Sequence, residues 1–374
     1  MASGVSLAGF SLERRGFDSL VGWSDDDPRE LIAALRRCRQ YILNKKPYRT
    51  GALGIRAEEL LPAMDAAEAV VEISSAAAAR SFFETHFVPF FIRREDGASG
   101  FVTAFYEPDV EVSDTPDAVW RFPFYRRPED LIDLDDANRP SSMDANYMFG
   151  QIRDGEISEY PDRRAIDLGH LEGQGLEIGW ARSKADVFFA HVQGAARLIF
   201  RDGTVRRITY AAKAGHPFTG IGRHLVDAGE IDPSKISMGA IRDWLERNPD
   251  RADETYWRNR SYIFFREEEM GDPALGPIAA AKVQMTPGRS LAVDRGIHTF
   301  GCPFFIQSES LTRLDDGQPF RRLMLALDTG SAILGPARGD IFTGSGSEAG
   351  DLAGSVRNDA NFFILVPRAA AERY

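Results

Sequence analysis

The sequence predicts a mainly β protein with flanking helices, in which a second β-rich domain is inserted into a domain made from both chain ends. Three observations support this prediction. The 374 residues, 43% of them hydrophobic, exceed what a single core usually serves. Apolar residues recur at helical spacing before residue 86, and strand-like runs follow it. The segment 107–140 is rich in Pro and Asp and indicates an exit into another unit.

Two helical regions are predicted near the N-terminus. The sequence Asp-Asp-Asp-Pro at 25–28, followed by Glu30, is typical of a helix start, with a capping acid and Pro in the first turn. Apolar residues then recur at helical spacing from Leu31 to Ile42. A second region, rich in Ala, Glu and Leu, covers about 57–83, with a break expected before Pro62.

Strands, with two helices in the middle of the chain, are predicted for the rest of the sequence. The Asp202-Gly203 pair between apolar runs predicts a tight hairpin, because Asp-Gly supplies the positive φ values of such a turn. Two helices are expected at about 220–228 and 238–248, the second capped by Ser237. The other predicted strands cover residues 87–92, 100–106, 262–266, 290–293, 304–307, 322–327 and 362–366.

The composition limits the classes of partner and cofactor. A net charge of -11 without a basic run argues against nucleic acid binding. The six histidines have no metal-binding spacing and the two cysteines form no CxxC site, so no metal and no cofactor are expected. No apolar stretch is long enough to span a bilayer, and no signal layout or lipid-attachment Cys is found at the start of this chain.

Two aspartates come together in the glycine-rich segment 326–344. An apolar strand delivers Asp328 at its end, and glycines at 330, 335 and 339 let the chain turn back to deliver Asp340. Two neighbouring carboxylates raise one another's pKa. A carboxyl that stays protonated near neutral pH can donate its proton to a glycosidic oxygen.

Two other interpretations of this segment stay open. Asp beside Gly also satisfies the backbone of an ordinary turn. The sequence Asp328-Thr329-Gly330 after a hydrophobic pair is also typical of an aspartic protease loop. Those enzymes need two such loops, and this chain has one, so a homodimer would have to supply the second.

The same segment resembles the MltA-type lytic transglycosylases, whose C-terminal 3D domain is named for three aspartates. Here these would be Asp294, Asp328 and Asp340. The family pattern Asp-x-Gly-(Gly/Ser)-Ala-Ile, then Asp with an aromatic residue and Gly-x-Gly, then Glu-Ala-Gly is met in order through Gly350.

The resemblance continues upstream and covers about residue 85 to the end. The segment 103–108 resembles the family's Thr-Gly-Tyr-Tyr-x-Pro, from which Ala104 and Phe105 depart. The segments 160–166, 188–194 and 210–218 fall where comparable motifs are expected, with Ala in place of the usual Asn at 214. The resemblance implies a double-psi β-barrel catalytic domain over 1–107 and 258–374, with an inserted MltA-specific β domain over 108–257.

The implied reaction cleaves the β-1,4 bond between N-acetylmuramic acid and N-acetylglucosamine of peptidoglycan without water and leaves a 1,6-anhydromuramoyl end. Asp340 matches the family's catalytic aspartate and would act as the single acid and base, with Asp328 in support. A hydrolytic glycosidase and a non-catalytic glycan-binding barrel are the alternatives.

The resemblance also implies residues that contact the glycan and a place of action. Four of these residues have a packing or hairpin role as the alternative, namely Thr103, Tyr106, Gln193 and Lys213. For Asp294 the alternative is a structural role. The expected partner is the peptidoglycan strand, with other cell-wall enzymes as further partners. The protein itself is expected to be a monomer in the bacterial periplasm or cell envelope. The candidate binding residues are Thr103, Tyr106, Gln193, Lys213, Asp294, Gly330 and Ala332.

Overall fold

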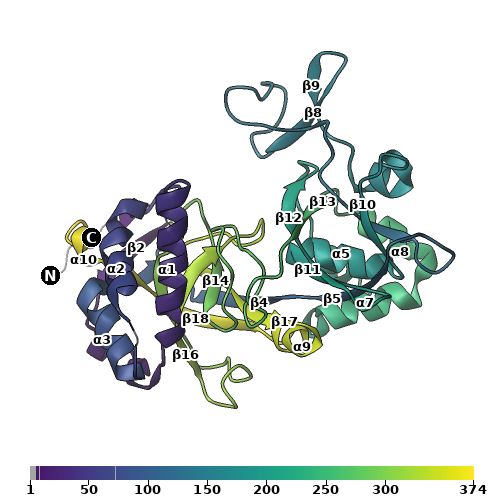
Figure 1. Ribbon diagram of the computed structural model, residues 1–374. Coiled ribbons are helices and arrows are strands. Elements are labelled where there is room, and N and C mark those ends of the chain that lie inside the picture. The colour runs from purple at the N-terminus through teal and green to yellow at the C-terminus, as the bar shows by residue number, and fades with distance from the viewer. Residues whose placement is uncertain (1–5, 8, 72) are drawn as a thin grey trace. The chain divides into compact units, whose positions relative to one another are not determined.

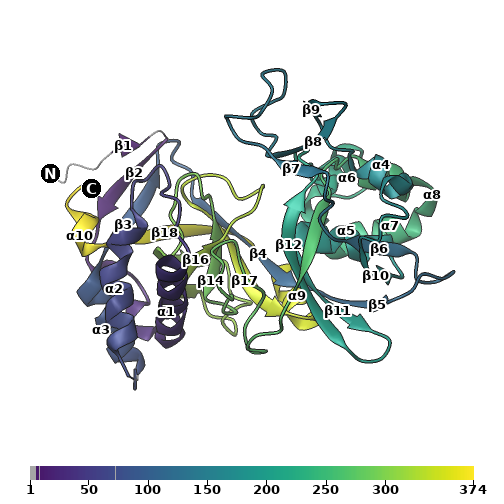
Figure 2. The ribbon, with the colours of Figure 1, turned by 45° about the horizontal axis from the view of Figure 1, so that its top comes forward.

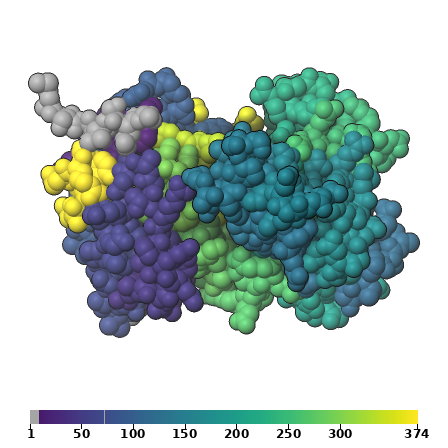
Figure 3. Space-filling view, turned by 90° about the horizontal axis from the view of Figure 1, so that it is seen from above, coloured from purple at the N-terminus to yellow at the C-terminus, as the bar shows by residue number. Residues whose placement is uncertain are grey.

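The computed structural model describes residues 6–7, 9–71 and 73–374 of the chain, which form two compact units. The end unit consists of Met1–Tyr106 together with Asp272–Tyr374, and the middle unit is Glu107–Gly271. In Figure 3 purple N-terminal and yellow C-terminal residues lie together on the end unit. The two ends of the chain therefore build one unit.

Three helices lie side by side at one side of the end unit (Figures 1 and 2). They are α1 (Arg29–Asn44), α2 (Ala57–Ala69) and α3 (Ala76–His86). The apolar stripe of α1 that runs from Leu31 to Ile42 is buried, as its helical spacing predicts. The predicted break before Pro62 is wrong: α2 continues through Pro62, and the chain leaves the helix only after Ala69.

One nine-stranded sheet makes up the rest of the end unit, in the order β1-β2-β3-β18-β15-β16-β14-β17-β4. Strand β4 also pairs with β18, so the sheet closes nearly completely into a barrel. The pair β14–β16 is parallel. The elements are β1 (Ser6–Leu7), β2 (Phe10–Arg14), β3 (Phe87–Arg94), β4 (Gly100–Glu107), β14 (Ser290–Val293), β15 (Pro303–Ser308), β16 (Phe320–Asp328), β17 (Arg338–Ser345), α9 (Ser347–Ala353), β18 (Arg357–Pro367) and α10 (Arg368–Ala371).

The apolar runs of these strands follow from burial on both faces. Every residue of β14 and β15 is buried, and so are the last six residues of β18. A strand covered on both sides needs no alternation of polar and apolar residues, so its sequence is a continuous apolar run. The strands predicted at 87–92, 290–293, 304–307 and 362–366 are therefore confirmed.

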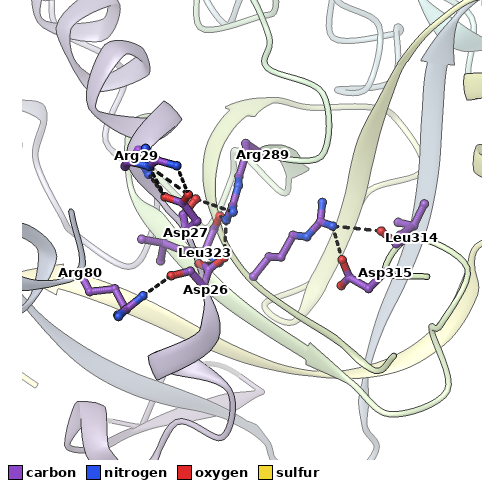
Figure 4. A network of polar contacts seen from close by, with 9 residues as sticks. Asp26, Asp27, Arg29, Arg80, Arg289, Leu314, Asp315 and Leu323 are labelled. Carbon is purple, nitrogen blue, oxygen red and sulfur yellow. Dashed lines mark hydrogen bonds and ion pairs between the residues drawn. The ribbon is translucent and has the colours of Figure 1, made fainter. Parts of the chain in front are cut away.

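A buried ion pair fastens the start of α1 to the barrel strands (Figure 4). Arg289 Nη1 donates to Asp26 Oδ1 (2.8 Å) and to the carbonyl of Leu323 (2.9 Å). The Leu323 N–H donates to the second carboxylate oxygen of Asp26 (2.8 Å). The helix itself begins after Pro28, which offers no capping side chain. Of the predicted capping acids, Asp26 thus serves the contact with the sheet.

The middle unit has a six-stranded sheet in the order β13-β12-β11-β5-β10-β6, a separate sheet β7-β8-β9, and several helices. Strands β5 and β11 pair in parallel, and the other pairs of the larger sheet are antiparallel. The elements are β5 (Asp109–Ser113), β6 (Phe122–Tyr125), β7 (Leu131–Asp133), β8 (Phe149–Arg153), β9 (Glu156–Ser158), α4 (Arg163–Ala165), β10 (Glu177–Ala181), α5 (Lys184–Gln193), β11 (Ala195–Phe200), β12 (Val205–Lys213), α6 (Ile221–Asp227), α7 (Met238–Arg247), α8 (Pro249–Trp257) and β13 (Ile263–Glu268).

Local signals in the middle unit were predicted well. Strands β11 and β12 form the hairpin expected around Asp202-Gly203, with Gly203 at φ +85°. Ser237 caps α7 by accepting a hydrogen bond from the Ala240 N–H (3.1 Å). The last strand of the unit, β13, pairs with β12, so the middle unit extends to Gly271 and not to 257.

The described part of the chain has no helix that is long and apolar enough to cross a membrane.

Candidate active site

Strand β14 brings the two aspartates of the glycine-rich segment onto one face of the barrel sheet. Ala292 of β14 pairs with Asp328 of β16 on one side and with Asp340 of β17 on the other. Residues that pair across neighbouring strands point to the same face. Two strand spacings separate the two aspartate Cα atoms, roughly 10 Å. The sequence predicted that Asp328 and Asp340 approach one another through the glycines between them. In the structure, strand β14, which lies outside that glycine-rich segment, stands between the two aspartates and aligns them.

Asp340 is partly buried and has a hydroxyl as its immediate neighbour. Thr103 of β4, the strand next to β17, donates its hydroxyl hydrogen to Asp340 Oδ1. Burial raises the pKa of Asp340, whereas the Thr103 hydrogen bond and the nearby charge of Arg338 act in the opposite direction. The carboxyl is thus prepared to carry a proton at a higher pH than an exposed aspartate.

Arg338 was missed by the sequence-based prediction, although it lies two residues before Asp340. Its Nη2 donates to the Thr103 hydroxyl (2.7 Å), and its guanidinium lies 5.4 Å from the ring centre of Phe101. Residues i and i+2 of a strand share a face, so the alternation of β17 was the available signal.

Asp328 is the second titratable group of the site. Its Oδ1 accepts a hydrogen bond from the Ala280 N–H (3.0 Å). The pKa of Asp328 is raised to about 6, mainly by burial; the charge of Asp340 acts in the same direction, and backbone donors and Lys282 act against it. A group with this pKa changes its charge near pH 6.

Asp294 uses both carboxylate oxygens within the fold. Oδ1 accepts from the Gly296 N–H (2.9 Å) and Oδ2 from the Gly335 N–H (2.8 Å). The buried His298 adds a bond from Nε2 to the carbonyl of Pro336 (2.8 Å). Asp294 and His298 together hold the loop that leads from Asp328 to Asp340.

Gly330 and Ala332 lie in the turn that follows Asp328. The Ile333 N–H donates to the carbonyl of Gly330 (2.9 Å), and Ala332 is exposed. Gly335, at φ +109°, then reverses the chain in a conformation that favours glycine. The turn therefore exposes its backbone next to Asp328.

Tyr106 lies at the end of β4 and packs on the helix α9. A Cβ atom placed on Gly350 would come within 2.8 Å of the Tyr106 ring. The glycine of the Glu-Ala-Gly pattern therefore lets the aromatic ring lie directly against the helix backbone.

Gln193 and Lys213 belong to the middle unit. The Gln193 side-chain amide donates to the sulfur of Met238 (3.4 Å). Burial lowers the pKa of Lys213, whose ammonium group forms no hydrogen bond or ion pair with any residue of the described ranges. Of the candidate residues, the end unit brings Thr103, Asp328 and Asp340 to one sheet face, while these two occupy a separate unit.

No group of three His, Cys, Asp or Glu side chains that could hold a metal ion is found among the residues the structure describes. Cys38 and Cys302 are both buried and free.

Comparisons with known proteins give a consistent result. The family model for the MltA specific insert domain matches residues 101–266, and the model for the 3D domain matches residues 289–366. A crystal structure of a membrane-bound lytic murein transglycosylase from Agrobacterium tumefaciens is 61% identical, with a TM-score of 0.92, and the match covers 97% of this chain and 99% of that chain.

Two further relatives are more distant. A crystal structure of MltA from Neisseria gonorrhoeae is 28% identical, with a TM-score of 0.78, over 98% of this chain and 94% of that one. The membrane-bound lytic murein transglycosylase A of Vibrio cholerae is 29% identical over 261 residues, or 68% of this chain. The matched part spans 62% of the length of that relative.

Proposed function

Because this chain belongs to the MltA family of lytic murein transglycosylases, we propose that it cleaves the glycan strands of peptidoglycan between N-acetylmuramic acid and N-acetylglucosamine. The observation that carries the proposal is the placement of Asp340. Its carboxyl is partly buried, its pKa is raised by burial, and it shares a sheet face with Asp328.

In the proposed reaction, Asp340 first donates its proton to the oxygen of the glycosidic bond as the bond from that oxygen to C1 of the muramoyl residue breaks. The C6 hydroxyl oxygen of the same residue then bonds to C1, and Asp340, now a carboxylate, takes the hydroxyl proton. The product is a 1,6-anhydromuramoyl end, and the enzyme returns to its starting state. One carboxyl serves both steps because the nucleophile belongs to the substrate, so no second base has to activate water.

Asp328 supports this chemistry in the proposal. With a pKa raised to about 6, it is largely ionised at neutral pH and adds negative charge to the sheet face where positive charge develops on the sugar. The turn at Gly330 and Ala332, together with Thr103, Tyr106 and Asp294, would line the glycan site of the end unit. In the middle unit, Gln193 and Lys213 are the proposed contacts.

The finer description of the fold is also part of the proposal. The closed pairing of β18, β15, β16, β14, β17 and β4 is consistent with a double-psi β-barrel as the catalytic domain, and the middle unit with the MltA-specific insert. We further propose that the protein acts as a monomer in the periplasm or cell envelope, where its substrate is found. Cell fractionation with analytical ultracentrifugation tests both statements.

Digestion of purified peptidoglycan sacculi, followed by mass spectrometry, tests the function. We expect anhydromuropeptides from the wild-type chain and a loss of about 10²–10⁴-fold for Asp340→Asn. Asp351→Asn is the matched control, because Asp351 is exposed on α9 and the substitution is isosteric. This control should keep full activity.

Other outcomes point to other functions. Reducing-end products would indicate a hydrolase and would contradict the proposed attack of the C6 hydroxyl on C1. An intact wall that still retains both the wild type and Asp340→Asn would indicate a glycan-binding barrel. Proteolysis that is inhibited by pepstatin and depends on dimerisation would indicate an aspartic protease that uses Asp328-Thr329-Gly330.

A further inference from the structure

We propose that Arg338 is a positioning residue that fixes the direction of the hydrogen bond between Thr103 and Asp340 and thereby places the acidic proton of Asp340 on its Oδ2 atom. The inference deepens the proposed function, on which it rests, by naming the oxygen atom that gives and recovers the proton.

The first step of the argument is the donor character of arginine. A guanidinium group only donates hydrogen bonds. Arg338 Nη2 lies 2.7 Å from the Thr103 hydroxyl oxygen, so this oxygen must accept. One lone pair of the hydroxyl is therefore occupied by Arg338.

The second step concerns the single hydrogen of the Thr103 hydroxyl. Within the described ranges, the bonds of this hydroxyl are the one from Arg338 and the one with Asp340 Oδ1. Its hydrogen has no other acceptor, so it points to Oδ1. If Thr103 accepted from a protonated Oδ1, its own hydrogen would be left without a partner in a partly buried site, at a substantial cost.

The third step places the transferable proton. With Oδ1 receiving the hydrogen of Thr103, a second hydrogen on Oδ1 would crowd the same pair of oxygen atoms. The neutral carboxyl therefore carries its proton on Oδ2. This atom receives no hydrogen bond from any side chain or backbone group that the structure describes, and so it remains available to a glycosidic oxygen.

The surroundings of Arg338 explain why it acts through Thr103. Its guanidinium lies over the Phe101 ring and also donates to the carbonyl of Gly339. It forms no ion pair with a carboxylate in the described part of the chain. A direct ion pair would hold Asp340 in its charged form. Contact through a hydroxyl orients the carboxyl and leaves it able to take up a proton.

A double-mutant cycle on the full chain tests the proposal. The variants are Arg338→Met, Thr103→Val and the double variant, and the measurement is kcat/KM on sacculi as a function of pH. Each single variant should lower kcat/KM roughly tenfold. Each should also move the alkaline limb upwards by about one pH unit, because the carboxylate loses a donor or a nearby charge.

The decisive comparison is additivity. If Arg338 orients Asp340 through Thr103, kcat/KM of the double variant at its optimal pH should be no lower than that of Thr103→Val alone, although its alkaline limb moves further because the charge of Arg338 is also lost. Arg338→Lys should restore most of the activity, because lysine is also a pure donor. Additive losses in the double variant, or no rescue by lysine, would overturn the proposal.

Two controls separate this proposal from folding defects and from the proposed function itself. Arg357→Met removes the same charge from an exposed side chain that pairs across from Thr103 on β18, and it should leave the pH profile unchanged. Titration of the Asp340 carboxyl by 13C NMR, assigned by comparison with Asp340→Asn, needs no catalysis. If the wild type released no anhydromuropeptides, the proposed function would fail, while this titration would still show whether both variants raise the pKa of Asp340.

Discussion

Two sites of this protein, one in each unit, bury carboxylates in opposite ways. In the middle unit, Glu107 is fully buried and pairs with Arg207, whose side chain is 1% exposed, through two hydrogen bonds of 2.7 and 3.0 Å. In the end unit, Asp328 accepts from backbone N–H groups and Asp340 from the Thr103 hydroxyl, and the guanidinium of Arg338 contacts this hydroxyl instead of a carboxylate. A paired carboxylate holds a strand in place, whereas a carboxyl buried without a cation is able to take up a proton.

This difference separates a structural from a chemical use of the same functional group. A bidentate pair with arginine satisfies the carboxylate and leaves it little to offer a ligand. A carboxyl without such a partner is less stable in its charged form, and its pKa rises. The end unit thus accepts a cost in stability at the place where we propose that the reaction occurs.

Breaking the ion pair of the middle unit should have the largest effect. Arg207→Met leaves Glu107 buried without its cation and should lower the free energy of unfolding by about 3–5 kcal/mol. Urea denaturation followed by tryptophan fluorescence would measure this, since four of the five tryptophans belong to the middle unit. The double variant Arg207→Met with Glu107→Leu should recover most of the loss, and an unchanged midpoint for the single variant would contradict the comparison.

Replacing Asp328, which has no paired cation within the described residues, should change the free energy of unfolding in the opposite direction and stabilise the protein at neutral pH. Because the pKa of Asp328 is raised from 3.8 to about 6 in the folded state, the native protein binds more protons than the unfolded chain between these values. The stability contributed by this group is therefore present below about pH 4 and is lost as the pH rises through about 6.

Asp328→Asn removes this loss. Relative to the wild type, the variant should gain on the order of 2–3 kcal/mol between pH 4 and pH 7.5 in its free energy of unfolding. Denaturation curves at both pH values give the difference. An equal offset at the two values would mean that Asp328 titrates as an ordinary exposed carboxyl.

Asp294 is a third kind of carboxylate in this protein, because among the described residues it accepts only from backbone N–H groups of a loop. Asp294→Ala leaves the N–H groups of Gly296 and Gly335 without their acceptor and should lower the free energy of unfolding by about 1–2 kcal/mol. Asp294→Asn keeps one acceptor oxygen and should lose about half as much. If alanine and asparagine behaved alike, the carboxylate would not be holding the loop through two bonds.

The smallest effect is expected at a partly exposed pair beside the buried one. Arg197, which faces Arg207 across the β11–β12 hairpin, forms two hydrogen bonds with Asp109 (2.6 and 2.8 Å), and these side chains are 26% and 33% exposed. Arg197→Met should cost no more than about 1 kcal/mol, because water screens and replaces such contacts. A loss as large as that for Arg207→Met would show that burial is not what separates the two pairs.

Much of the barrel was predictable because its strands are buried on both faces. The short apolar runs at β14, β15 and β18 are typical of covered strands, and the hairpin at Asp202-Gly203 has a local cause in its turn. The approach of Asp328 to Asp340 was also predicted, from the glycines between them.

Other features depend on partners far away in the sequence and had no local signal. Asp26 resembles a helix cap, but its partner Arg289 follows 263 residues later. The relation of Arg338 to Asp340 passes through Thr103, which only the pairing of β4 with β17 brings near. The predicted end of the middle unit at residue 257 lies before Gly271, because β13 joins that unit only through its pairing with β12.

The discontinuous end unit has a consequence for the order of events during synthesis on the ribosome. Strand β3 pairs with β18, in a register that joins Phe91 to Phe363. Translation adds about 5–20 residues per second, so β3 waits for many seconds before its neighbour exists. The middle unit is complete at Gly271, well before that time. We expect the insert to fold first, while the N-terminal strands of the barrel stay exposed to chaperones until β18 emerges.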